Sequence, residues 1–360
     1  MRRTILAHRV ATGGAAAFAA GLACVVGGAG AARSLVAYNL YPLVSDSSAV
    51  SAPLQDPSLV NGWGLSASAT SPWWTSNNGS NSSTLYSGVG SKVALTVTVA
   101  GGPTGTVANS YAADFVVSQN GASASAKFLF ATQSGQLLGW APSVNGTAAV
   151  TAVDDSSTGA EFDGLTTLND QLYATDFHNA RVDVFNASFA PLTLGFTDPK
   201  IPKGWAPFGI QALNGNIFVT YAQQDSTQRN AVHGGGLGYV DEFTPQGALV
   251  ARVASKGSAN GPLNAPWGLA IAPSSFGAYS GDLLVGNFGN GRISAYEQLA
   301  SGKWVYKGQL RVASGAPIAI DGLWAIAFGN GASAGPTNNL YFLSGPTNGT
   351  HGLFGFIGVG

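Results

Sequence analysis

Charged residues are scarce in this sequence. They make up 9% of its 360 residues, whereas an average soluble domain carries about 25%. The 16 basic and 17 acidic residues leave a formal net charge of −1, so nothing in the charge balance indicates a partner such as nucleic acid or an anionic membrane surface. Because 45% of the residues are hydrophobic, the low charge indicates an ordered chain whose solubility rests on Ser, Thr, Asn and Gly.

Cysteine is almost absent as well, since Cys24 is the only one. It lies in a segment with three arginines among the first nine residues, then an Ala- and Gly-rich apolar run, then a small-residue pattern. This order is typical of a signal peptide, and we predict one over residues 1–32, with a membrane anchor as the alternative. Its removal would leave one domain, residues 33–360, without cysteine, disulfide or further membrane span. We therefore expect a secreted, periplasmic or extracellular protein.

Long helical patterns are missing, and short apolar runs between turn residues take their place. The chain has 50 Gly and 17 Pro. Its clearest unit runs through 265–271, 281–288 and 291–296, which are typical of three short strands. Weaker copies recur as six units of about 50 residues, a period typical of propeller blades with four strands. We predict an all-β, six-bladed β-propeller; a parallel β-helix, the alternative, has much shorter repeats.

The copies align on a glycine that is followed by Leu or Ile. Five anchor glycines are clear: Gly64, Gly164, Gly209, Gly268 and Gly322. The first gap is about twice the others, so a blurred second copy must lie inside it, and we expect its first strand at 113–117. The strand-like run 35–46 precedes the first copy. We expect it to close the ring beside the C-terminal strands, because closure removes exposed sheet edges.

Residues 172–185 in the third copy carry a more specific pattern. A strand ends at Asp176, a turn contains Asn179 and Arg181, and a second strand ends in Val-Phe. This is similar to the second half of an NHL repeat. With further motifs, the chain resembles an uncharacterised family of secreted NHL-like propellers with bacterial, some eukaryotic and mimivirus members; these motifs are 207–210, 220–225, 264–269, 286–293 and 320–324. The resemblance implies a propeller fold and export. It implies no activity, because none is established for the family.

Channel residues are the first candidates for chemistry, because the first strand of each blade lines the centre of a propeller. The residue before each anchor glycine is expected there: Trp63, Asp163, Phe208, Trp267 and Asp321. With six blades the third lies opposite the sixth, so Asp163 and Asp321 would face each other as ligands of a hard cation such as Ca²⁺. Asp-Gly-Leu is similar to the channel motif of lactonase-type propellers, where a central metal activates the substrate. In the alternative, each Asp bonds backbone amides or faces channel water.

Histidines and tryptophans are the remaining candidates. His233 lies in a Gly-rich loop and is a candidate ligand-binding residue, with an exposed loop histidine as the alternative. A metal or lyase site would need His178 or His351 to converge with it. The tryptophans are candidates for a glycan-binding surface or for packing between blades: Trp73, Trp74, Trp205, Trp267 and Trp324.

Two functional hypotheses follow from these residues. The first is a non-catalytic binding or scaffold module whose partner is an extracellular protein, a glycan or a small molecule. The second is a Ca²⁺-dependent lactonase- or lyase-like hydrolase acting at the propeller channel. The sequence favours the first, because it lacks a dense set of titratable residues.

Overall fold

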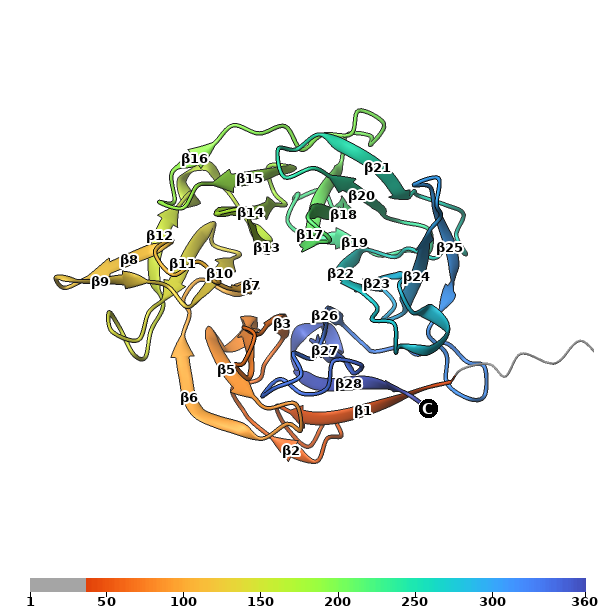
Figure 1. Ribbon diagram of the computed structural model, residues 1–360, viewed down its shortest axis with the longest axis horizontal. Helices are drawn as coiled ribbons and strands as arrows, with labels where there is room; N and C mark the ends of the chain where they lie inside the picture. Colours follow the sequence, from red (N-terminus) through yellow and green to blue (C-terminus); the bar gives the residue numbers. More distant parts are fainter. Residues whose placement is uncertain (1–36) are drawn as a thin grey trace, which may run out of the picture. The chain divides into compact units, whose positions relative to one another are not determined.

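The computed structural model describes residues 37–360, so the predicted signal peptide and Cys24 lie outside the described residues. The described residues form six antiparallel blades of four main strands around a common centre (Figure 1). This confirms the predicted six-bladed β-propeller. Strands β3, β7, β13, β17, β22 and β26 are the innermost of their blades, and each chain segment runs outward from there.

The first three blades follow the chain in order. Blade one contains β3 (Gly62–Ser66), β4 (Trp73–Asn77), β5 (Ser82–Tyr86) and β6 (Lys92–Thr98). Blade two contains β7 (Pro103–Ala108), β10 (Phe128–Thr132), β11 (Gln136–Trp140) and β12 (Val150–Asp154), with the hairpin β8 (Val116–Gln119) and β9 (Ala122–Ser125) inserted after β7. Blade three contains β13 (Phe162–Leu168), β14 (Gln171–Asp176), β15 (Arg181–Phe185) and β16 (Pro191–Leu192).

The last three blades complete the ring. Blade four contains β17 (Trp205–Leu213), β18 (Asn216–Gln224), β20 (Tyr239–Phe243) and β21 (Leu249–Ala254), with β19 (Ala231–Val232) paired to β18. Blade five contains β22 (Pro266–Ile271), β23 (Leu283–Asn287), β24 (Ile293–Gln298) and β25 (Trp304–Gln309). Blade six contains β26 (Leu323–Phe328), β27 (Leu340–Ser344), β28 (Leu353–Val359) and β1 (Tyr38–Ser45), with β2 (Leu54–Gln55) beside β1. The helical parts are three 3₁₀ turns, Asn78–Ser80, Ser156–Thr158 and Gly277–Tyr279, and α1 (Pro346–Gly349).

The ring is closed by the start of the described chain, as predicted. Strand β1 pairs antiparallel with β28, from Tyr38 opposite Val359 to Ser45 opposite Leu353. The buried Tyr38 hydroxyl donates a hydrogen bond to the carbonyl oxygen of Phe276 in blade five, at 3.0 Å. Blade six is therefore built from both ends of this part of the chain, and the same strand contacts the preceding blade.

Several blade turns follow directly from short polar sequences. Asn169 and Asp170 both have positive φ, 51° and 58°, and they join β13 to β14 as a two-residue hairpin. Asn214 and Gly215 do the same between β17 and β18, with φ of 52° and 79°. Two successive residues with positive φ are the requirement of a type I′ turn, whose twist matches the strands that it connects. Asn and Gly adopt this conformation at low cost, which is why these turns occur here.

The inner strand of each blade carries the same irregularity. Its pairing with the second strand shifts register at one place, and a glycine or alanine lies there: Gly64, Gly105, Gly164, Gly209, Gly268 and Ala325. A Cβ atom at Gly209 would overlap the Trp267 carbonyl oxygen of the next inner strand, and one at Gly105 would lie 2.5 Å from the Leu165 nitrogen. The glycines therefore allow neighbouring inner strands to approach closely at the centre.

This alignment corrects two predictions. The inner strand of blade two is β7 with Gly105, and the predicted segment 113–117 instead leads into the inserted hairpin. The predicted sixth anchor, Gly322, lies before β26 with φ of 61°, and Ala325 takes the inner position. Both predictions were wrong because the search for a glycine followed by Leu or Ile passed over Gly105, which Thr106 follows, and Ala325. The packing at the centre requires only a small residue. In blade two this residue is Gly105, and the residue after it is Thr106 instead of Leu or Ile.

Large aromatic side chains pack between neighbouring blades. Trp73 stands 5.2 Å from Tyr341 in blade six, and Trp74 stacks 4.2 Å from Phe128 in blade two, both as ring-centroid distances. Both tryptophans are buried, so they belong to the packing alternative and not to an exposed glycan surface. Among residues 37–360, no helix is long and apolar enough to cross a membrane.

The close approach of the inner strands predicts that Gly209→Ala is strongly destabilising. We expect the free energy of unfolding to fall by about 2 kcal/mol or more, because the added methyl group meets rigid backbone. Gly195→Ala is the matched control, since its Cβ would meet no described atom within 4 Å, and we expect a change below about 0.5 kcal/mol. Urea denaturation of both variants measures the difference, and equal stability would contradict the packing argument.

Candidate functional site

The structure defines one inward-facing position in every blade, immediately before the small residue of the inner strand. Six residues occupy it: Trp63, Thr104, Asp163, Phe208, Trp267 and Trp324. Four of them were predicted from the sequence. Thr104 and Trp324 were missed, because the anchor glycines of blades two and six were misassigned. Aligning Trp-Ala-Ile at 324–326 with Trp-Gly-Leu at 267–269 would have identified Trp324 as an inward-facing residue.

Aromatic rings from different blades meet at the centre. We call this group the aromatic plug; it comprises Trp63, Phe208, Trp267, Phe288 and Trp324. The Trp324 ring stacks on Trp63 and on Phe288, with centroid distances of 3.7 and 3.9 Å. Its other contacts, with Phe208 at 5.8 Å and Trp267 at 6.0 Å, are edge-to-face. Because Trp324 touches both Trp63 of blade one and Phe208 of blade four, which are opposite blades in a ring of six, the plug spans the channel.

Asp163 is the one acid at the inward-facing positions. It is 1% exposed, and its Oδ1 atom has no hydrogen-bond partner within residues 37–360. Burial raises the pKa of Asp163 well above its ordinary value, and the nearby carboxylates of Glu161 and Asp176 raise it further. The environment therefore favours the neutral acid, since a buried charge without a partner is costly.

Asp321 does not occupy the position that the sequence predicted. It precedes β26, is exposed, and accepts a hydrogen bond at 2.8 Å from the Thr347 backbone N–H. The inward-facing position of blade six belongs to Trp324, so Asp163 and Asp321 are not equivalent residues on opposite strands. That premise of the Ca²⁺ site was wrong. In the part of the chain that the structure describes, no three His, Cys, Asp or Glu side chains gather with metal-binding geometry. Ca²⁺ binding itself stays a prediction.

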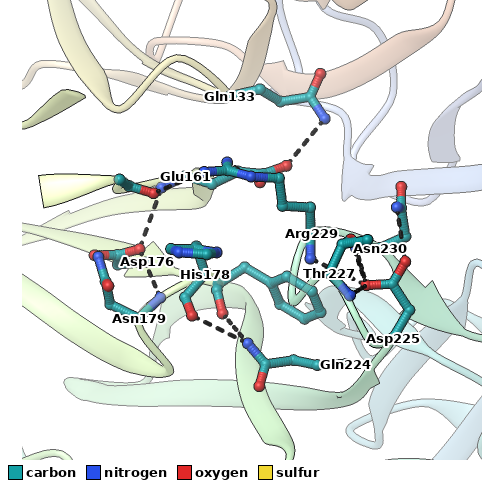
Figure 2. Close-up of polar contacts among 12 residues, drawn as sticks. Gln133, Glu161, Asp176, His178, Asn179, Gln224, Asp225, Thr227, Arg229 and Asn230 are labelled. Carbon is teal, nitrogen blue, oxygen red and sulfur yellow. Dashed lines mark hydrogen bonds and ion pairs between the residues drawn. The ribbon is translucent and has the colours of Figure 1, made fainter. Parts of the chain in front are cut away.

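A connected row of polar side chains adjoins the plug where the inner strands begin. We call it the polar arc; it comprises Asn61, Asn78, Gln133, Glu161 and Arg229. Trp324 Nε1 donates to Asn61 Oδ1 at 3.2 Å, and Asn61 Nδ2 donates to Asn78 Oδ1 at 3.1 Å. Asn78 Nδ2 then donates to Gln133 Oε1 at 2.8 Å. Figure 2 shows the next links, in which Gln133 Nε2 (3.3 Å) and Arg229 Nη1 (2.9 Å) donate to the Glu161 carboxylate. The arc links the turns of blades one to four.

Glu161 is the buried charge of this arc. It is 4% exposed, and burial raises its pKa, while the hydrogen bond and charge of Arg229 lower it in part. Arg229 is half exposed, so the pair contributes at most about 1 kcal/mol of stability. Its loop is held by Asp225, whose carboxylate accepts backbone N–H groups from Thr227 and Arg229 (Figure 2). The carboxylate of Glu161 is thus already engaged on both oxygens.

The three described histidines lie in different surroundings. The His178 Nδ1 atom is buried and has no hydrogen-bond partner in the described range. The backbone carbonyl oxygen of His178 accepts a hydrogen bond from Gln224 Nε2 at 3.2 Å (Figure 2). His233 packs edge-on against Phe288 of the plug at 4.9 Å, and burial lowers its pKa. His351 Nδ1 lies 2.9 Å from Asp46 Oδ2 at the closing strand. His233 therefore lies beside the plug, and its ligand-binding role stays a prediction, whereas His351 binds Asp46 in blade six.

A cavity of about 320 Å³ lies in the channel on the other side of the plug. We call it the channel cavity. Its walls are formed by residues that follow the small residue in each inner strand, including Leu65, Leu165, Ile210, Leu269 and Ile326. Trp267 of the plug also lines it. Among the described residues that line this cavity, none is Asp, Glu, His, Lys or Arg. The channel therefore offers an uncharged hollow on one side and the polar arc on the other.

Comparisons with known proteins agree with the fold. No protein-family model matches the chain. An uncharacterised protein of Acanthamoeba polyphaga mimivirus is 29% identical over 353 residues, which cover 94% of this chain and 84% of the relative. This agrees with the mimivirus resemblance drawn from the sequence, while the assignment to NHL repeats stays a prediction.

Two solved structures show the same architecture. A protein of unknown function from Bacteroides thetaiotaomicron superposes with a TM-score of 0.54 at 14% identity, covering 89% of this chain and 76% of the other. Virginiamycin B lyase from Staphylococcus aureus superposes with a TM-score of 0.52 at 9% identity, covering 89% of this chain and 99% of the other. At these identities the likeness shows the propeller fold alone.

The buried acid at the channel predicts a pH-dependent stability. The folded protein holds the Asp163 proton more tightly than the unfolded chain, so its stability falls as the pH rises from the ordinary value of 3.8 toward the raised folded pKa. We expect Asp163→Asn to be more stable than the wild type near neutral pH by about 1 kcal/mol, with a smaller difference near pH 4. Urea denaturation across this pH range measures it. The stability of the exposed Asp170→Asn variant should change with pH as that of the wild type does. A stability difference between Asp163→Asn and the wild type that stays the same at every pH would contradict the raised pKa of Asp163.

Proposed function

We propose that this protein is a non-catalytic binding module that takes a small, uncharged molecule with both apolar and polar groups in the channel cavity. The observation that carries the proposal is the lining of this cavity. Its walls combine aliphatic and aromatic side chains with uncharged polar ones, and its described lining has no titratable side chain. The polar side chains are Ser66, Thr106, Gln211, Asn214 and Asn330. A hollow of this kind binds apolar surface but supplies no general acid, general base or nucleophile.

The size and the mouth of the cavity suit such a ligand. Its volume of about 320 Å³ falls within the range of roughly 300–1,000 Å³ that small-molecule pockets span. Each 100 Å² of apolar ligand surface removed from water contributes about 2.5 kcal/mol. The partly exposed Gln211 and the exposed Asn214 lie among the lining residues, so amide groups are present to bind one polar end of the ligand.

The same geometry gives less support to a metal-dependent hydrolase at the channel. That hypothesis needed two acids facing each other across an open centre, but Asp321 stands outside the inward-facing positions and aromatic rings fill the middle. Asp163 lacks a charged partner, and the Glu161 carboxylate is occupied by Gln133 and Arg229. The lyase among the structural neighbours shares the fold, and fold alone does not carry activity.

Export belongs to this proposal. The basic start, the apolar run and the small-residue pattern of residues 1–32 support a secreted or cell-surface location. The scarcity of charge and the absence of cysteine from residues 37–360 are consistent with it. The ligand or partner would then be an extracellular small molecule or the exposed part of a larger one.

Filling the channel cavity should abolish binding without unfolding the protein. The neutral probe N-phenyl-1-naphthylamine, whose fluorescence rises in apolar surroundings, should bind the wild type saturably. In the double variant Ala67→Phe/Ala327→Phe, two added rings occupy the cavity, and we expect the apparent affinity to fall at least tenfold. Because both alanines are only partly buried, the melting temperature should change little.

The matched control is Ala300→Phe, which adds the same ring at an exposed turn outside the cavity. It should bind the probe like the wild type. A wild type that does not bind the probe saturably, or a double variant that binds it equally well, would contradict the channel cavity as the binding site.

A further inference from the structure

Most polar side chains that line the channel cavity are already engaged within the protein. The Ser66 hydroxyl accepts a hydrogen bond from the Ala108 backbone N–H at 2.9 Å. The Thr106 hydroxyl donates its proton to the backbone carbonyl oxygen of Leu129 at 3.0 Å. Both groups therefore connect a blade to its own second strand or to the next blade, and their first role is structural.

The Asn330 amide is used completely. Its Nδ2 atom donates to the backbone carbonyl oxygens of Ser68 and Ser71 at 2.8 and 2.9 Å. Its Oδ1 atom accepts the backbone N–H groups of Ala332 and Ala334 at 2.9 and 3.0 Å. Asn330 thus ties the loop between β26 and β27 to the loop between β3 and β4, and no part of its amide is left for a ligand.

Gln211 and Asn214 differ from these three residues. Neither side-chain amide forms a hydrogen bond with the described part of the protein. Gln211 is partly exposed and Asn214 is exposed, and neither amide is among the buried polar groups that lack a partner, so both are open to a ligand. Both belong to blade four, Gln211 in β17 and Asn214 in the turn from β17 to β18. The amides available in the described lining therefore lie on one wall.

Apolar side chains with accessible surface form the rest of the mouth. They are partly exposed lining residues of blades two, four, five and six, namely Val107, Leu213, Ile271 and Phe328. The described lining has no Lys, Arg or His, so an anionic ligand would find no partner for its charge. The cavity therefore suits a neutral ligand with an apolar body and one hydrogen-bonding edge, which is directed to blade four.

The chemistry of the Gln211 amide narrows the choice of that edge. A primary amide carries an N–H donor beside a carbonyl acceptor in one plane. A cyclic amide has the same pair in reverse order on its edge, so two hydrogen bonds form at once. A ketone or an ether offers only an acceptor and leaves the Gln211 carbonyl oxygen unpaired. A carboxylic acid matches only while it is protonated, and at neutral pH it is an anion.

We propose that the ligand of the channel cavity is a flat cyclic amide, meaning a lactam or a cyclic imide, and that Gln211 selects it. The Gln211 Nε2 group donates to the ligand carbonyl oxygen, and Gln211 Oε1 accepts the ligand N–H. The body of the ligand lies against the apolar side chains of the mouth. This inference rests on the proposed function, because it names the ligand class of the same cavity.

The test uses the whole protein and two probes that differ in one group. Carbostyril is a flat bicyclic lactam, and N-methylcarbostyril lacks only its N–H. In calorimetric titrations carbostyril should bind the wild type about tenfold more tightly, because the methylated probe loses one hydrogen bond. Gln211→Leu, which keeps a side chain of similar size, should remove this preference. Its melting temperature should change little, because the amide has no partner within the described protein.

Gln298→Leu is the matched control, since it removes an exposed amide of β24 that does not line the cavity. It should keep the preference for carbostyril. The cavity-filling variant Ala67→Phe/Ala327→Phe should lose carbostyril binding, which would locate the lactam in the channel cavity.

Four outcomes would overturn the inference. They are the absence of carbostyril binding, equal binding of the two probes by the wild type, a preference that persists in Gln211→Leu, and tighter binding of the anion quinaldate than of carbostyril. If the wild type still binds N-phenyl-1-naphthylamine saturably in these cases, the proposed function stands and only the ligand class is wrong. If that probe does not bind either, the proposed function and this inference both fail.

Discussion

The close backbone approach of the six inner strands is the constraint on which this molecule depends. At one place in each inner strand the residue is Gly or Ala, because a larger side chain would strike the next strand. The strand bulges there, and the preceding residue is directed to the centre. The set of inward-facing side chains follows from this packing, and the pairing of β1 with β28 closes the ring.

The same constraint explains why the centre is filled and where the hollows lie. A ring of six blades brings the inward-facing residues close enough for Trp324 to touch rings from blades one, four and five. Aromatic side chains at these positions therefore pack against one another and divide the channel. The polar arc lies on one side, and the uncharged channel cavity lies on the other. Thr104 and Asp163 are the exceptions among the six, and burial raises the pKa of Asp163 well above its ordinary value.

Part of the candidate site was accessible from the sequence. Trp63, Asp163, Phe208 and Trp267 were found because each precedes a glycine that is followed by Leu or Ile. Trp324 and Thr104 were missed because the local pattern there is Trp-Ala-Ile and Thr-Gly-Thr. The polar arc could not be predicted at all. Its links join residues from 17 to 68 positions apart in sequence, and they exist only because blade turns meet around one centre.

The sequence by itself determined the all-β class, the six repeats and the closure by the N-terminal strand, because each rests on local periodicity, turn residues and the avoidance of open sheet edges. The tertiary structure alone decided what occupies the centre and where cavities remain. Those properties depend on which side chains from distant blades meet, and Tyr221 illustrates the difference. Its local sequence, residues 220–225, belongs to the motifs of the resemblance but does not indicate what surrounds the hydroxyl group. Only the packing of blades three and four leaves that hydroxyl buried without a partner among the described residues.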